Sequence, residues 1–457
     1  MTNLPRLLIC APSSNSGKTT LTIALLAAFK KSGLAPCAFK CGPDYIDPMF
    51  HRMVLGISGR NLDLFFTKPD IVNGLFAEGA KSADIAILEG AMGYYDGIAM
   101  SDEASSFKMA EATQTPAVLV IRPEGSALSA AALVKGFLGF REPNLIKAVV
   151  LNGCSKAMAG RYAEAIESEC HVRVYGFLPN LPEAKIESRH LGLVTPDDVT
   201  SLIEKVELLA CEAQKTIDID GLLELAKSAP QLEGRLPKIS AITENTCIAV
   251  AMDQAFCFYY DENLRLIEKL GGKILPFSPL SDGSLPKNAA ALYIGGGYPE
   301  LHAKALSENS DIKTAILAAV KSGMPTIAEC GGFMYLGKNL EDDKGVLWSM
   351  VGALDFDAFR RKALRRFGYI GMTAQKDNLL CKAGETINAH EFHYWDTTQN
   401  GSDFAARKPK SNKSWQCCIA TESLYAGFPH LYFCSNPKVA ENFVKAAASY
   451  KEKNNLV

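Results

Sequence analysis

Residues 9–20 read ICAPSSNSGKTT and lie directly after a short apolar run. That run predicts a first strand over residues 7–10, and the spacing of apolar residues after the loop predicts a helix over residues 19–31. A glycine-containing loop between a strand and a helix offers backbone N–H groups and a helix N-terminus to a phosphate. The stretch therefore predicts an α/β fold, a parallel sheet covered by helices, with a phosphate-binding loop after its first strand.

The side chains of this loop suit a nucleotide. A lysine can reach the outer phosphates, and the hydroxyl after it can bind Mg²⁺. The usual pattern G-x-x-x-x-G-K-[ST] has glycine where this chain has Pro12, so the loop is a variant. A Gly-Lys helix start without function is the alternative, which the strand-loop-helix context disfavours. The residues expected to bind ATP are Ser14, Asn15, Ser16, Gly17, Lys18, Thr19 and Thr20.

Acidic residues follow two further predicted strands, residues 37–40 and 84–88. Asp44 and Asp47 lie in KCGPDYIDP after the first, and Glu89 precedes GAMGYYDG after the second. The carboxyl ends of neighbouring parallel strands converge, so these loops should meet beside the phosphate loop. An acidic residue after one strand is commonplace, whereas two such loops favour a site. The expected ligand is ATP with Mg²⁺, and the residues expected to hold the metal are Thr19, Asp47 and Glu89.

The length of 457 residues predicts more than one domain. Strand-like and helical segments alternate through the first half, with further strands expected at residues 117–121, 148–151 and 172–177. The segment SAPQLEGRLPKIS, residues 228–240, reads as a connector. The alternation then restarts, with strands expected at residues 247–253, 273–279, 290–297 and 324–332 and a helix at 262–270. We therefore expect domains over residues 1–240 and 241–457.

Composition disfavours several classes of protein. Lys plus Arg is 48 against Asp plus Glu 50, so no basic field is available to attract nucleic acid. No apolar run approaches about eighteen residues, and the N-terminal segment lacks the pattern of a secretory signal. The 13 cysteines are scattered without a C-x-x-C pair, which argues against disulfides and a zinc ribbon. We expect a cytoplasmic protein with neither nucleic acid nor membrane as partner.

A second chemistry is indicated by GMPTIAECGGFMYL, in which Cys330 lies between an apolar strand and two glycines. A strand-to-helix elbow of this kind exposes a nucleophile beside helix N–H groups and favours a thiolate. Upstream, YIGGGYPE ends another strand in glycines whose backbone N–H groups could stabilise an oxyanion. The expected oxyanion donors are Gly296, Gly297 and Gly331. Three downstream histidines could each supply the base: His390, His393 and His430.

Eight motifs, in this order, resemble those of the glutamine-dependent a,c-diamide synthases of corrinoid biosynthesis, and they cover nearly the whole chain. They are APSSNSGKTT, KCGPDYIDP, NLDLF (residues 61–65), EGAMGYYDG, RHLGLV (residues 189–194), GGGYPE, ECGGFMYL and HEFHY. The resemblance implies a P-loop, dethiobiotin synthetase-like parallel-sheet domain that binds ATP. It also implies a class I glutamine amidotransferase α/β domain after it.

The resemblance assigns roles in the second domain. Cys330 would attack the side-chain amide of glutamine, and His430 would be its base, because FPHLYF matches a terminal motif of the family. Many class I amidotransferases carry a glutamate two residues after this histidine, where this chain has Tyr432. The third member of the site is therefore open. HEFHY would be a loop near the substrate or the other domain, with His390 and His393 as candidates to contact substrate carboxylates.

The implied reaction is the ATP- and glutamine-dependent amidation of the a and c acetate groups of cobyrinate, or a related tetrapyrrole, in cobalamin biosynthesis. Phosphoryl transfer from ATP would give an acyl phosphate, which ammonia then displaces. The residues expected to position the tetrapyrrole are Asp44, Tyr45 and Asp63.

Other interpretations stay open. Nickel-sirohydrochlorin and hydrogenobyrinate a,c-diamide synthases share the motifs, whereas cobyric acid synthase is disfavoured because this chain is short for it. A partitioning-ATPase type of ATP-driven switch is an alternative from a different class, against which the elbow at Cys330 argues. Among assemblies, a homodimer is also open.

Overall fold

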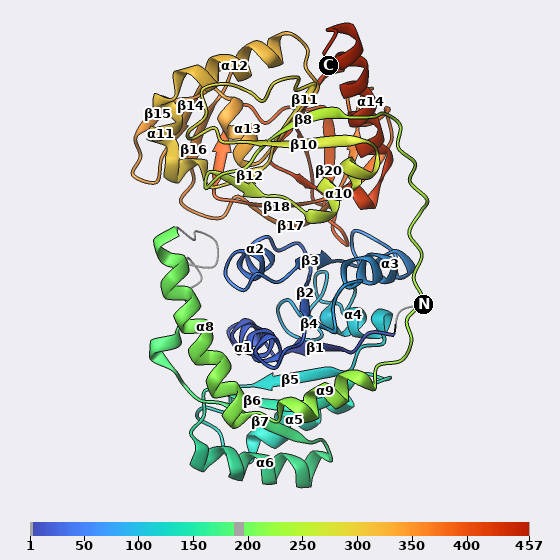
Figure 1. The fold of residues 1–457 in the computed structure, drawn as a ribbon, viewed down its shortest axis with the longest axis vertical. Helices are drawn as coiled ribbons and strands as arrows, with labels where there is room; N and C mark the ends of the chain where they lie inside the picture. The colour runs from blue at the N-terminus through green and yellow to red at the C-terminus, as the bar shows by residue number, and fades with distance from the viewer. Residues whose placement is uncertain (1–2, 187–195, 457) are drawn as a thin grey trace. The chain divides into compact units, whose positions relative to one another are not determined.

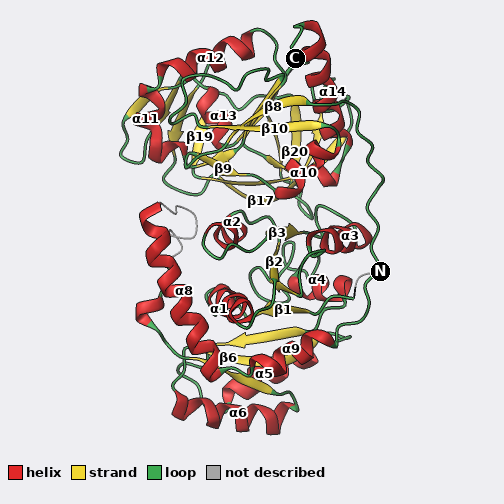
Figure 2. Cartoon of the chain, viewed as in Figure 1, coloured by secondary structure: helices red, strands yellow, loops and turns green. Residues whose placement is uncertain are grey.

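The computed structural model describes residues 3–186 and 196–456. The chain divides into two compact units, Met1–Pro237 and Lys238–Val457, and each is built of strands and helices (Figure 1; Figure 2). The predicted α/β class is confirmed in both units. The motif RHLGLV, residues 189–194, lies outside the described residues.

The first unit is built on one parallel sheet of seven strands in the order β3-β2-β4-β1-β5-β6-β7. Strands β1, β4 and β5 are buried along their whole length, as expected for a parallel sheet with both faces covered. The strands are β1 (Arg6–Cys10), β2 (Pro36–Cys41), β3 (Gly59–Leu62), β4 (Ile85–Glu89), β5 (Ala117–Ile121), β6 (Ile146–Asn152) and β7 (Val174–Leu178). All of the strands predicted for this half are confirmed.

Helices alternate with the strands of the first unit and follow the last of them. They are α1 (Lys18–Lys31), α2 (Ile46–Met53), α3 (Pro69–Gly79), α4 (Ser106–Thr113), α5 (Ser129–Gly139), α6 (Lys156–Cys170), α8 (Pro196–Thr216) and α9 (Ile219–Lys227). Helix α1 packs against α8 and carries buried leucines on its inner face. This packing fixes the N-terminus of α1 beside the carboxyl ends of the strands, where the phosphate loop lies.

The second unit contains a six-stranded sheet in the order β10-β8-β11-β13-β23-β22, which is parallel except at β22–β23. Its strands are β8 (Thr246–Ala251), β10 (Gly272–Phe277), β11 (Ala291–Ile294), β13 (Thr326–Glu329), β22 (Ile419–Ala420) and β23 (Leu424–Gly427). The strand predicted over residues 290–297 ends earlier, at Ile294. After it, β12 (Gly296–Gly297) pairs with β9 (Phe256–Phe258) in a separate antiparallel ribbon.

Two antiparallel or mixed sheets complete the second unit, and the sequence pattern did not predict them. One holds β14 (Asn339–Glu341), β15 (Leu347–Ser349), β16 (Asp357–Arg360) and β19 (Trp395–Thr397). The other holds β17 (Arg366–Ala374), β18 (Thr386–His393), β20 (Phe404–Arg407), β21 (Ser414–Cys417) and β24 (His430–Leu431). The helices are α10 (Asp261–Lys269), α11 (Ala303–Glu308), α12 (Ser310–Lys321), α13 (Gly331–Leu336) and α14 (Lys438–Lys453).

Within residues 3–186 and 196–456, no helix has the length and apolar character needed to cross a membrane.

Candidate functional site

The phosphate loop joins β1 to α1, and its shape depends on Gly17. Gly17 adopts φ 99°, a left-handed conformation that favours glycine. A Cβ atom at this position would lie 1.9 Å from Nδ2 of Asn152. The same Nδ2 donates a 3.1 Å hydrogen bond to the carbonyl of Ser16, so the loop is held against the end of β6. Another residue here would have to displace the Asn152 side chain and adopt a strained φ.

Lys18, the first residue of α1, turns back over its own loop. Its Nζ donates to the carbonyl of Ser13 at 3.0 Å and to the carbonyl of Met92, which follows β4. Burial lowers the pKa of Lys18, and the nearby charge of Lys40 acts in the same direction. The ammonium group is thus held by carbonyl oxygens at the place where an anionic phosphate would be a stronger partner.

Behind the loop, Lys40 lies between acidic side chains. Its Nζ is 2.8 Å from Oε1 of Glu89 and also donates to the carboxylate of Asp47. The hydroxyl of Thr19 donates to the same Oε1 of Glu89 at 2.6 Å. The carboxylate of Asp44 is 3.8 Å from Nζ of Lys40. The structure therefore brings the three predicted metal residues together, with an unpredicted lysine among them.

The charges in this cluster depend on one another. Burial alone would lower the pKa of Lys40, but the charges of Asp47, Glu89 and Asp44 raise it well above its ordinary value. Burial opposes ionisation of Asp47, yet the charge and hydrogen bond of Lys40 hold its pKa below the ordinary value. Burial and the charge of Asp47 raise the pKa of Glu89 to about 7. Lys40 is therefore a fixed cation at the carboxyl ends of β2 and β4.

Oxygen atoms in the cluster could receive Mg²⁺. Oε2 of Glu89 is buried and has no hydrogen-bond partner among the described residues, whereas Asp47 is engaged by Lys40. The described ranges contain no group of three or more His, Cys, Asp and Glu side chains arranged as a metal site. Mg²⁺ needs few protein ligands because it keeps several waters. Thr19 and Glu89 therefore fit this metal better than Asp47 does.

The predicted tetrapyrrole residues lie in two loops that contact each other. Nδ2 of Asn61 donates to the carbonyls of Gly42 at 2.9 Å and Asp44 at 2.6 Å, which ties NLDLF to KCGPDYIDP. Oδ1 of Asp63 accepts the backbone N–H of Phe65 at 2.7 Å, and the residue is only 2% exposed. Asp63 therefore stabilises its own turn, and its predicted contact with substrate is not supported by its burial.

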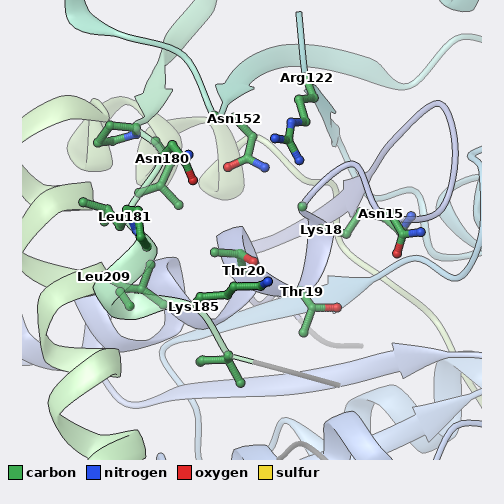
Figure 3. Close-up of a pocket in the computed structure, with 17 residues that line it drawn as sticks. Asn15, Lys18, Thr19, Thr20, Arg122, Asn152, Asn180, Leu181, Lys185 and Leu209 are labelled. Carbon is green, nitrogen blue, oxygen red and sulfur yellow. The ribbon is translucent and has the colours of Figure 1, made fainter. Parts of the chain in front are cut away.

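A cavity of about 610 Å³ extends from the phosphate loop across the ends of β6 and β7 (Figure 3). This volume is in the range of small-molecule sites. The predicted residues on its wall are Asn15, Gly17, Lys18, Thr19 and Thr20. Ser14 and Ser16 are not among its lining residues. Residues that the sequence did not predict also line it, including Arg122, Asn152, Asn180, Leu181 and Lys185.

In the second unit, Cys330 lies at the elbow between β13 and α13. Its φ of 49° and ψ of −100° are strained for a residue with a side chain. Its N–H donates to the carbonyl of Gly427 at 2.8 Å, which holds the elbow against the end of β23. Strain of this kind at a strand-to-helix turn is found where a nucleophile is presented.

The predicted oxyanion glycines connect Cys330 with His430. A Cβ atom on Gly296 would lie 2.4 Å from Cε1 of His430, so the imidazole packs directly on this glycine. A Cβ atom on Gly331 would lie 3.1 Å from the backbone nitrogen of Gly297. The glycine loop after β11 therefore contacts both the residue that follows Cys330 and the predicted base.

Burial decides the charges at this site. It raises the pKa of the Cys330 thiol, and the charge of Glu300 adds to this effect. The expectation of a thiolate is therefore wrong for the structure without ligand. Burial lowers the pKa of His430 to about 3, which leaves a neutral imidazole at physiological pH. A neutral thiol and a neutral base are suited to proton transfer when the substrate arrives.

The segment HEFHY is not a loop, as the sequence had suggested, because its residues through His393 end strand β18. His390 pairs with His430 across β18 and β24, and the ring of His393 stacks on Phe428 at 3.9 Å between centroids. Burial lowers the pKa of His390 to about 3 and that of His393 to about 4. Neither therefore offers a charge to a substrate carboxylate.

Comparison with known proteins agrees with this geometry. Residues 7–194 match the CobQ/CobB/MinD/ParA nucleotide binding domain, and residues 247–438 match the CobB/CobQ-like glutamine amidotransferase domain. A cobyrinate a,c-diamide synthase of Caldanaerobacter subterraneus is 37% identical over 98% of this chain and 99% of its own. The chain belongs to the cobyrinate a,c-diamide synthase family.

Other members of the cobyrinate a,c-diamide synthase family are similar over nearly their full length. A protein of this name from Listeria innocua is 38% identical over 95% of this chain and 97% of its own, and one from Thermoplasma volcanium is 35% identical over 99% of each. The resemblance seen in the sequence motifs is therefore confirmed.

Two polar residues of this family member were missed from the sequence alone. Lys40 is the last residue of a predicted strand, and Asn152 directly follows another predicted strand. A polar residue at the carboxyl end of a parallel strand is the signal that would have found both. The same signal applies to Glu329, which ends β13 directly before Cys330.

Proposed function

We propose that this chain converts the a and c acetate carboxylates of cobyrinate to amides, with ATP and glutamine as co-substrates. The observation that carries the proposal is the presence, in one chain, of a phosphate loop with Lys18 and Thr19 and an amidotransferase elbow with Cys330 and His430. The names of the relatives support the substrate. Residues 1–240 would activate the acid, and residues 241–457 would release ammonia. A cytoplasmic location and a homodimer stay predictions.

Activation is the task of the first unit. A carboxylate is a poor acyl donor because oxide would have to leave, whereas an acyl phosphate loses phosphate. The carboxylate oxygen attacks the γ-phosphorus of ATP, and ADP leaves. Lys18, Lys40 and the N–H groups of the loop stabilise the charge on the transferred group. Thr19 and Glu89 would hold Mg²⁺, which supplies further positive charge to the phosphate oxygens.

Ammonia release is the task of the second unit. His430 takes the proton of Cys330 as the sulfur attacks the amide carbon of glutamine. The N–H groups of Gly297 and Gly331 would stabilise the oxyanion. His430 then gives the proton to the leaving nitrogen, which departs as ammonia and leaves a thioester. Water hydrolyses the thioester to glutamate, and ammonia displaces phosphate from the acyl phosphate.

A comparison of nitrogen donors tests this division of work. Full-length Cys330→Ser, incubated with cobyrinate and ATP, should make no diamide with glutamine but should make it with ammonium chloride, as measured by mass spectrometry. Cys247→Ser is a matched control in the same unit and should retain both activities, because Cys247 lies on β8 away from the elbow. Loss of both activities in Cys330→Ser, with normal folding, would refute the proposal.

A separate experiment tests which macrocycle is the substrate. Cobyrinate, hydrogenobyrinate and nickel-sirohydrochlorin are each supplied with ATP and glutamine, and kcat/KM is compared. The proposal expects cobyrinate to give the highest value. A higher value for either of the other two macrocycles would overturn the assignment of cobyrinate as the substrate.

A further inference from the structure

The carboxyl group of Glu329 lies beside the ring of His430. Glu329 is the last residue of β13, directly before Cys330, and is 1% exposed. Its Oε2 is 3.9 Å from Nδ1 of His430. One strand end therefore supplies both the nucleophile and an acid that faces the base.

The position of this carboxyl group is fixed from two sides. The backbone N–H of Leu431 donates to Oε1 at 3.2 Å, and the hydroxyl of Tyr293 donates to Oε2 at 3.2 Å. Tyr293 is fully buried on β11, which pairs with β13. A side chain held by two hydrogen bonds in the core loses little further entropy when it interacts with a third group.

The imidazole is confined on another edge by Gly296, whose backbone it contacts through Cε1. With Nδ1 directed at Glu329, Nε2 is the ring nitrogen that we expect to accept the proton of the thiol. A hydrogen-bond acceptor at Nδ1 fixes the tautomer that keeps the lone pair on Nε2. Such contacts are often long without substrate and shorten in the complex, as the 3.9 Å separation would need to do.

Tyr432 cannot take this part, although it occupies the position where many class I amidotransferases have glutamate. Its side chain is fully buried and packs edge-on against the ring of Tyr260, with centroids 5.0 Å apart. A phenol at this place carries no negative charge at neutral pH. The acid must come from elsewhere in the fold.

We propose that Glu329 is the positioning residue of His430, in place of the glutamate expected at position 432. In its ionised form it holds the tautomer with the lone pair on Nε2 and stabilises the imidazolium formed when Cys330 transfers its proton. Burial raises the pKa of Glu329 to about 8, so the ionised form increases as the pH rises through this value. This inference depends on the proposed glutamine hydrolysis by the second unit. It completes a Cys330–His430–Glu329 set in which two members are consecutive in the chain.

The test uses full-length Glu329→Gln, which keeps the size of the side chain. Glutamine-dependent kcat should fall by roughly 10²- to 10⁴-fold, while the KM for glutamine stays within about twofold. Ammonia-dependent amidation should be unchanged, which also shows that the chain is folded. An unchanged glutamine-dependent kcat would overturn the proposal. Glu329→Asp should recover part of the loss, because it restores the charge.

A second variant guards against misfolding of Glu329→Gln. Tyr293→Phe removes only the hydroxyl that donates to Oε2, and it should lower glutamine-dependent kcat about 3- to 10-fold, as expected for one net hydrogen bond. The rate at which iodoacetamide alkylates Cys330 should fall in both variants. This readout needs neither glutamine nor tetrapyrrole, so it separates failure of this inference from failure of the proposed function. Wild-type alkylation rates in both variants would contradict it.

Discussion

Nζ of Lys40 donates to Oε1 of Glu89 at 2.8 Å, across adjacent strands in which the two residues are register partners. The side chains are 7% and 1% exposed, so this pair is screened little by water. Removing one member of a buried pair leaves a charge that nothing compensates. The stability of the charged cluster at the carboxyl ends of β2 and β4 therefore depends on Lys40.

Lys40→Met should lower the free energy of unfolding of the first unit by about 3 to 5 kcal/mol. Amidation should be lost with either nitrogen donor, because activation fails. Urea denaturation and product assays measure the two effects. Lys31→Met is the control: Lys31 pairs with Glu207 at 3.3 Å while its side chain is 42% exposed, so water screens this pair and its removal should change stability little. Wild-type stability and activity in Lys40→Met would contradict the argument.

Lys18→Ala should abolish both glutamine-dependent and ammonia-dependent amidation. Its ammonium group is held at the phosphate loop, where it would meet the γ-phosphate. Glutamine hydrolysis by the second unit, measured as glutamate formed without ATP or tetrapyrrole, should persist. Amidation at saturating ATP in this variant would show that Lys18 has another role.

Gly296→Ala should abolish glutamine-dependent turnover and spare ammonia-dependent turnover. The added methyl group would lie 2.4 Å from Cε1 of His430, so the ring must shift from its present position. Gly283→Ala is the matched control, since a Cβ there meets nothing within 4 Å. Steady-state assays with both nitrogen donors compare the two variants. Equal activity in both would mean that the ring position is not critical.

The stability of the second unit should depend on pH through Glu329. Burial raises its pKa from 4.5 to about 8, so the folded state keeps a proton that the unfolded chain releases. The contribution to stability is complete below pH 4.5 and is lost as pH rises through about 8. Between about pH 6 and about pH 9, the Tm of Glu329→Gln should therefore fall less than the Tm of the wild type. Calorimetry that found equal losses would exclude this titration.

Local sequence signals predicted the strands of the parallel sheets and several residues of both sites. Gly17, Lys18 and Cys330 were recognised because each lies where a strand, a short glycine-containing turn and a helix follow one another within a few residues. These are short-range patterns, which depend little on the rest of the chain. The predicted strands of the parallel sheets are confirmed for the same reason.

Interactions between distant segments could not be predicted. Lys40 meets Glu89 only because β2 pairs with β4, and His430 meets His390 only through the pairing of β24 with β18. Neither strand pairing can be predicted from the spacing of residues in the sequence. The burial that lowers the pKa of His390 and raises that of the Cys330 thiol likewise comes from tertiary packing.

The pairing of β13 with β23 determines where the second unit can accept insertions. Glu329 is opposite Gly427 in that ladder, so the segments that carry Cys330 and His430 leave the sheet from neighbouring strand ends. Their separation is set by backbone geometry, whereas residues 337–423 form a long excursion between them. Insertions at exposed tips of that excursion, such as Asp343 and Lys344, should be tolerated by glutamine hydrolysis.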